Sequence, residues 1–248
     1  MLQAVTTSKV DSVRSLFDKP DKYLNPRQFD IRIRVETVAH LTRDLAPERA
    51  LDIGCGDGSI SLQLLHRCNH LTLVDVSSKM LALARKNMPM ERSKDVELIN
   101  GDVMHANLMP QAFDLILCLG VLAHVDSPAA LIGELARLAR PGASVILECT
   151  DSYHFWGVPV VFYQKFLKLL RPEPYALNRL KNRQILRLCQ QNGFEVTRLY
   201  RYGLPPLGAS FVAGPDKLYR SIRWIFGPPE GNRNTWMGNQ FIYRLKKT

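Results

Sequence analysis

The chain has 248 residues, of which 46% are hydrophobic and 23% charged, as in an ordinary globular protein with one substantial core. No apolar run approaches the roughly 18 to 20 residues of a membrane span, and the N-terminus has no apolar stretch of signal-peptide length. The net charge of +10 is unevenly distributed, since residues 1–150 carry 17 basic and 18 acidic residues, whereas residues 151–248 carry 16 basic and 5 acidic residues. The second part is therefore either a solvated basic surface or a contact surface for an anionic partner.

Helical and extended patterns alternate between residues 31 and 150. Apolar side chains at helical spacing predict a helix over 31–45, and a short apolar run predicts a strand over 50–53. The alternation continues with helices over 59–67, 77–87 and 127–140, and with strands over 71–76, 96–100, 113–119 and 143–149. Strands rich in Val, Ile and Leu that alternate with amphipathic helices indicate a parallel sheet covered on both faces, a doubly wound α/β fold.

The C-terminal part has a different pattern. A helix is predicted over 183–192, closed by Gly193, and strands are predicted over 194–202 and 239–247. No helix is expected in the Pro- and Gly-rich connection between these strands, so they should form an antiparallel pair at the end of the sheet. The whole chain is therefore predicted to be one domain with a seven-stranded, mostly parallel sheet and an antiparallel last strand.

Three stretches outside the core at residues 31–150 are expected to determine specificity. Residues 1–30 are predicted to form an N-terminal lid, and residues 151–180 and 203–238 are predicted to be insertions that cap the substrate. The first insertion mixes aromatic and basic side chains: Tyr153, Phe155, Trp156, Phe162, Tyr163, Phe166, Lys165, Lys168 and Arg171. Such a surface suits an apolar ligand with an anionic end or a peripheral contact with an anionic membrane. A solvated helix over the sheet edge is the alternative.

A glycine-rich loop, LDIGCGDGS at residues 51–59, directly follows the first predicted strand. A turn without side chains lets a ligand approach the backbone and the N-terminus of the next helix. The spacing fits a dinucleotide fingerprint imperfectly, because Ser59 stands where the third glycine would fall, and a phosphate-binding loop is excluded because no Gly-Lys-Ser/Thr follows. The residues of this loop that we expect at the ligand are Asp52, Gly54, Cys55, Gly56 and Gly58.

The loop is closer to the Asp-x-Gly-x-Gly-x-Gly loop of class I, Rossmann-like S-adenosylmethionine-dependent methyltransferases, and the chain resembles that family over about residues 31–150. The resemblance implies that the backbone of the three glycines runs alongside the methionine part of the cofactor and that Asp52 helps hold its ammonium group. Cys55 is interpreted as a filler of the loop and not as a nucleophile.

Two further acids follow successive strands. Asp75, followed by Val76, ends the second strand, where a carboxylate can accept hydrogen bonds from both ribose hydroxyls. In the sequence NGDV, at residues 100–103, the resemblance implies that Asp102, beside Val103, accepts a hydrogen bond from the adenine amine.

The sequences FDLILCLGVLAHV, at residues 113–125, and PGASVILE, at residues 141–148, resemble the family's fourth motif and the approach to its fifth strand. The fourth motif implies that the backbone around Cys118 and Leu119 lines the methionine moiety.

Transfer of a methyl group from a sulfonium requires alignment of the acceptor and, for a hydroxyl acceptor, removal of a proton. His124, which follows the fourth strand, is the first candidate base because imidazole titrates near neutrality; packing or capping of the next helix is its alternative role. Tyr153 with His154 and, in the N-terminal segment, Tyr23 are further candidates. Aromatic packing is their alternative role.

No metal is predicted at this site. Some relatives that methylate quinone-precursor hydroxyls resemble Glu-Val-Leu-Glu-His-Val around this histidine, with acids that can bind a divalent metal. This chain has Gly120 and Ala123 at the two acidic places. The five cysteines form no Cys-x-x-Cys pair and are expected to be reduced thiols of a cytoplasmic protein.

The sequence therefore predicts an enzyme that transfers a methyl group from S-adenosylmethionine to a small-molecule acceptor and releases S-adenosylhomocysteine. Oxygen is preferred as the acceptor atom, before nitrogen and carbon. One alternative is an RNA or protein methyltransferase whose basic part contacts phosphates, although the chain has no appended RNA-binding module and no Asn-Pro-Pro-Tyr or Asp-Pro-Pro-Tyr tetrapeptide. Another is a non-catalytic protein that retains the cofactor pocket. The identity of the acceptor and the oligomeric state stay open.

Overall fold

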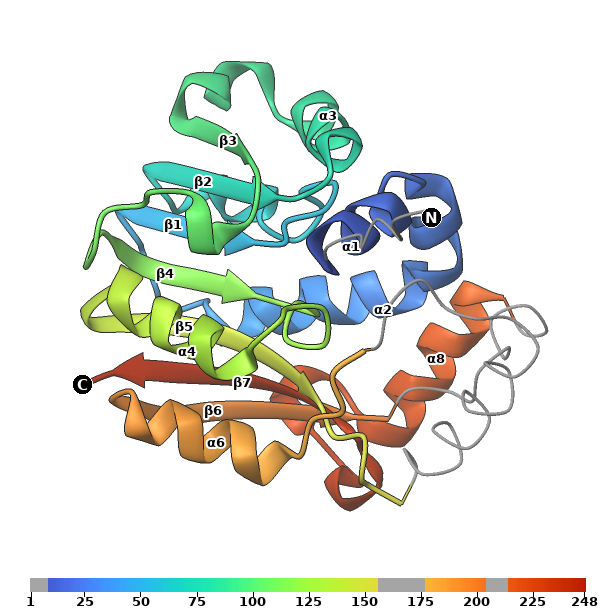
Figure 1. The fold of residues 1–248 in the computed structure, drawn as a ribbon. Coiled ribbons are helices and arrows are strands. Elements are labelled where there is room, and N and C mark those ends of the chain that lie inside the picture. Colours follow the sequence, from blue (N-terminus) through green and yellow to red (C-terminus); the bar gives the residue numbers. More distant parts are fainter. Residues whose placement is uncertain (1–8, 156–176, 204–213) are drawn as a thin grey trace, which may run out of the picture.

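The computed structural model describes residues 9–155, 177–203 and 214–248 (Figure 1). Its centre is a seven-stranded sheet with the order β3-β2-β1-β4-β5-β7-β6. The strands are β1 (Arg49–Ile53), β2 (His70–Asp75), β3 (Val96–Asn100), β4 (Phe113–Cys118), β5 (Ala139–Thr150), β6 (Phe194–Tyr202) and β7 (Gln240–Lys247). The first five are parallel, and β7 runs antiparallel to both β5 and β6. The predicted doubly wound fold with an antiparallel last strand is thus confirmed.

Helices cover both faces of the sheet (Figure 1). They are α1 (Lys9–Phe17), α2 (Pro20–Leu41), α3 (Ser78–Asn87), α4 (Pro128–Leu138), α6 (Asn182–Gln191) and α8 (Pro215–Phe226), with short 3₁₀ turns η1 (Leu62–His66), η2 (Met90–Asp95), η3 (Val103–His105), η4 (Pro229–Gly231) and η5 (Thr235–Met237). Helices α4 and α6 bury apolar side chains in one hydrophobic core, and α2, α3 and α8 do so in the other. Successive residues of β4 serve both cores, since Ile116 belongs to the first and Leu117 to the second.

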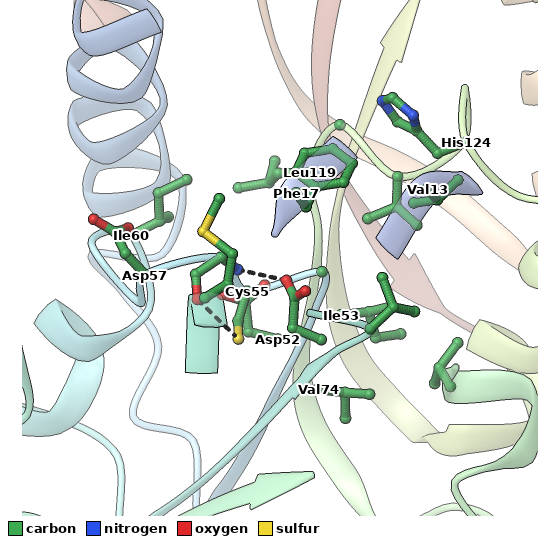
Figure 2. Close-up of a pocket in the computed structure, with 18 of the residues that line it drawn as sticks. Val13, Phe17, Asp52, Ile53, Cys55, Asp57, Ile60, Val74, Leu119 and His124 are labelled. Carbon is green, nitrogen blue, oxygen red and sulfur yellow. Dashed lines mark hydrogen bonds between the residues drawn. The ribbon is translucent and has the colours of Figure 1, made fainter. Parts of the chain in front are cut away.

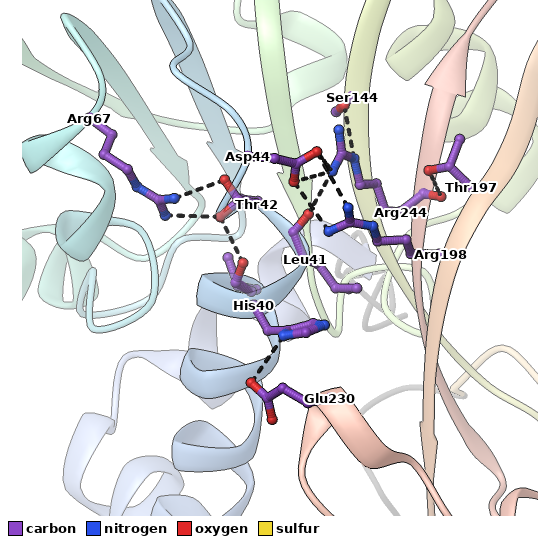
Figure 3. Close-up of polar contacts among 11 residues, drawn as sticks. His40, Leu41, Thr42, Asp44, Arg67, Ser144, Thr197, Arg198, Glu230 and Arg244 are labelled. Carbon is purple, nitrogen blue, oxygen red and sulfur yellow. Dashed lines mark hydrogen bonds and ion pairs between the residues drawn. The ribbon is translucent and has the colours of Figure 1, made fainter.

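The helix expected over 31–45 begins earlier and ends earlier. Helix α2 starts at Pro20, so it runs through the boundary expected between residues 30 and 31, and it ends at Leu41. The carbonyl of Thr42 accepts a hydrogen bond from Arg67 Nη1 at 2.9 Å, and its hydroxyl donates to the carbonyl of Val38 at 2.7 Å (Figure 3). The Arg67 side chain, which lies outside the helix, therefore hydrogen bonds to the Thr42 carbonyl, which would accept a backbone amide if the helix continued.

The helix expected over 59–67 is also shorter, and it is the 3₁₀ turn η1. The guanidinium of Arg92 donates to the carbonyl of Leu65 and, at 2.8 Å, to that of Cys68. These carbonyls are thus satisfied by a side chain and not by continuation of a helix.

The prediction of no helix between the last two strands is wrong. Helix α8 lies there and buries Leu218, Ile222 and Phe226, which recur every four residues. This spacing, together with Pro215 in the first turn, is a helical signal. Helix α8 packs against α2.

The end of α2 is fixed to the antiparallel part of the sheet. Asp44 accepts hydrogen bonds from Arg244 of β7 at 2.7 and 2.9 Å and from Arg198 of β6 at 3.2 and 3.5 Å (Figure 3). Arg244 also donates to the carbonyl of Leu41, the last residue of the helix, at 3.0 Å. One carboxylate thus links the helix to both strands.

A buried polar cluster joins the middle of α2 to β5 and β6. The Arg34 guanidinium contacts both carboxylate oxygens of Glu148, at 2.8 and 3.1 Å, and lies 3.2 Å from an oxygen of Asp30. The hydroxyl of Tyr202 donates to Asp30 at 2.6 Å. Burial raises the pKa of Glu148. The two buried carboxyl groups are tolerated because they share one cation.

Replacement of Arg34 by Met is expected to lower the free energy of unfolding by about 3–5 kcal/mol, because two carboxyl groups would stay buried without a cation. Urea unfolding followed by circular dichroism measures this loss. The matched control is Arg32→Met, which removes an exposed pair with Asp216 from the same helix and should change stability by no more than about 1 kcal/mol. Equal losses in the two variants would contradict the role given to the buried cluster.

Candidate active site

The carboxyl ends of three neighbouring strands bring their connections to one edge of the sheet. Ile53 of β1 lies level with Val74 of β2 and with Cys118 of β4, so the chain leaves all three strands at the same height. A pocket lies at this edge and is closed on its other side by residues of α1 and α2 (Figure 2). This is the place where doubly wound sheets bind their ligands.

The glycine loop presents backbone to this pocket. The amides of Gly54 and Cys55 donate to the carbonyl of Val74 at 2.8 and 3.2 Å, which holds the loop on the end of β2. Gly56 lines the pocket at a φ of +56°, and a Cβ built there would meet no atom within 4 Å. A ligand can therefore approach the backbone closely at this residue, which a side chain would prevent.

Two buried acids lie beside the loop. Asp75 accepts hydrogen bonds from the amides of Gly56 and Ser77, both at 2.8 Å. Asp52 is 3% exposed, and burial, followed by the negative charge of Asp75, raises its pKa to about 7. Burial also raises the pKa of Asp75. Both side chains line the pocket, so a ligand with hydroxyl groups and a positive charge would relieve the cost of their burial.

Most of the other residues expected at the cofactor line the same pocket: Gly54, Cys55, Val76, Asp102, Val103 and Leu119. Cys118 and Gly58 do not line it. Cys118 is fully buried, and a Cβ at Gly58 would lie 2.8 Å from the Leu62 side chain. Asp102 accepts a hydrogen bond from the amide of Met104 at 3.0 Å and so caps η3.

Helix α1, which lies within the segment predicted as an N-terminal lid, contributes a wall of the pocket whose residues were not predicted from the sequence. Val13 and Phe17 lie with His124 at one end of the pocket, and Asp57 and Ile60 lie at the other (Figure 2). The spacing of Val10, Val13 and Phe17 is a helical signal that could have revealed this wall.

Polar contacts hold α1 and the residue after it on the pocket. The Arg14 guanidinium donates to the carbonyl of Val76 at 3.2 Å, and Asp18 accepts a hydrogen bond from the Ser77 hydroxyl at 2.7 Å. These contacts fix the helix to the end of β2.

His124 and Tyr23 meet across the ring of Phe17. The centre of the Phe17 ring lies 5.4 Å from that of His124 and 4.6 Å from that of Tyr23, both with edge-to-face geometry. Burial and the positive charges of Arg27, Lys9 and Arg34 lower the pKa of His124 to about 4. The imidazole is therefore neutral at physiological pH.

The other two candidate catalytic residues lie elsewhere. Tyr153 is 54% exposed, and its ring lies 4.7 Å from the ammonium group of Lys181. His154 Nε2 lies 2.9 Å from the carbonyl oxygen of Trp236. Neither lines the pocket. The residues of the expected insertion from Trp156 to Arg171 lie outside the described residues.

Within residues 9–155, 177–203 and 214–248, no group of three or more His, Cys, Asp or Glu side chains could hold a metal ion. None of the helices in these ranges is both long and apolar enough to cross a membrane. All five cysteines are buried as free thiols, and burial raises the pKa of Cys55, which keeps that thiol protonated.

Known proteins resemble this chain in sequence and in fold. A family described as "Methyltransferase domain" matches residues 51–147. The ubiquinone biosynthesis O-methyltransferase of Aromatoleum aromaticum is 30% identical over 206 residues, which cover 80% of this chain and 82% of that protein. A protein of the same name from Pseudoalteromonas translucida is 27% identical over 203 residues, with the same coverage of 80% and 82%.

The structural likeness extends over almost the whole chain. With a TM-score of 0.68 and 17% identity, the structure resembles magnesium protoporphyrin IX methyltransferase from Synechocystis with bound S-adenosylhomocysteine, covering 97% of this chain and 100% of that one. The chain therefore belongs to the class I S-adenosylmethionine-dependent methyltransferases, as an enzyme with S-adenosylmethionine as its cofactor and S-adenosylhomocysteine as the product.

Proposed function

We propose that this enzyme methylates a hydroxyl oxygen of an apolar, aromatic small molecule. The observation that carries the proposal is the composition of one end of the pocket, where His124 lies with the apolar side chains of Val13 and Phe17 (Figure 2). Apolar walls that include an aromatic ring, beside a group that can hydrogen bond, suit an aromatic ring that carries a hydroxyl. The relatives named ubiquinone biosynthesis O-methyltransferase support oxygen as the acceptor atom.

The opposite end of the pocket suits the cofactor. We propose that Asp75 accepts hydrogen bonds from the ribose hydroxyls and that Asp102 accepts one from the adenine amine. The backbone of Gly56 would lie alongside the methionine part of the cofactor. The open space at Gly56 supports this fit. Asp52 supports it as well, because a buried acid with a raised pKa gains most from a nearby ammonium group.

When bound, the cofactor supplies a methyl group on a sulfonium, and its transfer to the acceptor oxygen forms a C–O bond, breaks the C–S bond and leaves a neutral thioether. The chain's own residues have to align the acceptor and exclude water. The neutral imidazole of His124 has one protonated and one unprotonated ring nitrogen. It can therefore accept a hydrogen bond from an acceptor hydroxyl or donate one to an ionised acceptor oxygen. Tyr23 and Phe17 would pack on the acceptor ring.

The affinity for S-adenosylhomocysteine is expected to fall as the pH falls below about 7. The pKa of Asp52 is about 7 in the protein without ligand, so at lower pH the acid is neutral and no longer attracts the ammonium group; the loss should approach about tenfold per pH unit. Calorimetric titration between pH 5.5 and 8.5 measures it. Asp52→Asn should bind more weakly at pH 8 and show a flatter profile. An affinity that does not change with pH in the unaltered enzyme would contradict this role.

Asp75→Ala is expected to weaken binding of S-adenosylmethionine by about 10- to 100-fold, because it removes charged hydrogen bonds to the ribose and the anchor of the Gly56 amide. The matched control is Glu97→Ala, which removes an exposed acid from β3 and should leave the affinity unchanged. Calorimetry measures binding by both variants, and circular dichroism checks their folding.

Transfer of a tritiated methyl group to catechols and to aromatic amines tests the acceptor atom. We expect labelled methyl ethers from the catechols and no labelled amines. Labelled amines alone, formed by protein that binds the cofactor, would contradict O-methylation.

A further inference from the structure

We infer that Lys9 and Arg27 form a cationic rim at the acceptor end of the pocket and that this rim binds the aromatic acceptor in its ionised, phenolate form. The inference rests on the proposed O-methylation and names the state in which the hydroxyl acceptor is recognised. It follows from the position of two cations beside His124 and from the partners of each cation.

The side chain of Lys9, the first residue of α1, contacts the loop that carries His124. Its ammonium group donates to the carbonyl of Val125 at 2.6 Å and to the side-chain oxygen of Asn178 at 3.2 Å. Asn178 in turn donates to the carbonyls of Leu122, at 3.0 Å, and Val125, at 2.6 Å. The ammonium group is thus held in place by neutral oxygens, and among the described residues it forms no ion pair with a carboxylate. Within the described part of the chain, this leaves a cation without a paired carboxylate beside Val125, which lines the pocket.

Arg27 lies next to Tyr23, which lines the pocket. Its guanidinium carbon lies 4.8 Å from the centre of the Tyr23 ring. Tyr23 packs on Phe17, and Phe17 packs on His124. Arg27 is exposed and forms no salt bridge with a described carboxylate. The contact with the Tyr23 ring orients the guanidinium but does not neutralise its positive charge.

Arg34 differs from these two cations. It lines the pocket, but its charge is shared between Asp30 and Glu148. We therefore assign the recognition of an anion to the rim and not to this arginine.

The charged groups around His124 give this end of the pocket a positive field. Burial lowers the pKa of the histidine most, and the positive charges of Arg27 and Arg34 on α2 and of Lys9 on α1 lower it further. Tyr23 of α2 and Asp126 of the histidine's own loop also line the pocket. The part of this shift that comes from the three cations favours a phenolate at the same place, whereas burial disfavours either charged form.

When the acceptor binds as a phenolate, His124 does not have to act as a base. A phenol that gives up its proton to water on binding needs no protein base that stores the proton. The neutral imidazole then positions the oxygen through a hydrogen bond, and the apolar walls strengthen the attraction between the phenolate and the rim because they exclude water.

The test uses 4-nitrocatechol, whose visible spectrum changes on ionisation, bound to the full-length enzyme together with S-adenosylhomocysteine. We expect binding to lower the pKa of the dye by about one pH unit relative to water, which corresponds to about a tenfold preference for the anion. Lys9→Met and Arg27→Met should each raise the pKa of the bound dye, and the double variant should return it to the value in water. The control is Arg32→Gln, which removes a cation of α2 that pairs with Asp216 and should leave the bound dye unchanged.

Three results would overturn the inference: a bound dye that titrates as in water, a lowered pKa that persists in the double variant, or no dye binding by enzyme that still binds S-adenosylhomocysteine. Binding of S-adenosylhomocysteine by each variant shows that it is folded. The tritium transfer assay separates this inference from the proposed function. A lowered dye pKa without any methylated hydroxyl would support the rim and contradict only O-methylation.

Discussion

The two hydrogen bonds accepted by the Asp75 carboxylate are the contact on which the site depends. One oxygen takes the amide of Gly56 and the other takes the amide of Ser77, both at 2.8 Å. The first bond holds the glycine loop against the end of β2, and the second supports the turn into α3. Because the carboxylate is buried, these bonds also stabilise its ionised form. A single side chain thus shapes the loop and stays directed at the pocket, where we propose that it binds the ribose.

Helix α2 connects this site to the far part of the sheet. Its C-terminal end is held by Asp44 through Arg198 and Arg244 (Figure 3). Its middle is held by the ion pair between Arg34 and Glu148. The N-terminal turns of the same helix supply Tyr23 to the pocket. The antiparallel strands, which are distant from the glycine loop in the sheet order, therefore position one wall of the acceptor end.

The two ends of the pocket differ in charge, and this difference organises the proposed chemistry. Asp52 and Asp75 make the end at the glycine loop acidic, and burial raises the pKa of both. At the other end, Lys9 and Arg27 lie beside a histidine whose pKa is lowered to about 4. A cofactor with a positive charge and an acceptor that ionises to an anion would therefore each meet a field of the opposite sign.

The sequence by itself determined the end of the pocket at the glycine loop, where we propose that the cofactor binds. A glycine loop behind a buried strand, and acids at the ends of the first two strands, follow from local turn chemistry and hydrophobic periodicity, and parallel pairing brings such strand ends together. Only the tertiary structure decided the acceptor end. It brings Phe17 and Lys9 to His124, leaves Tyr153 and His154 outside the pocket, and packs α8 on α2. These contacts join residues far apart in the chain, and their formation depends on long-range packing and charge pairing, which residue spacing along the sequence does not encode.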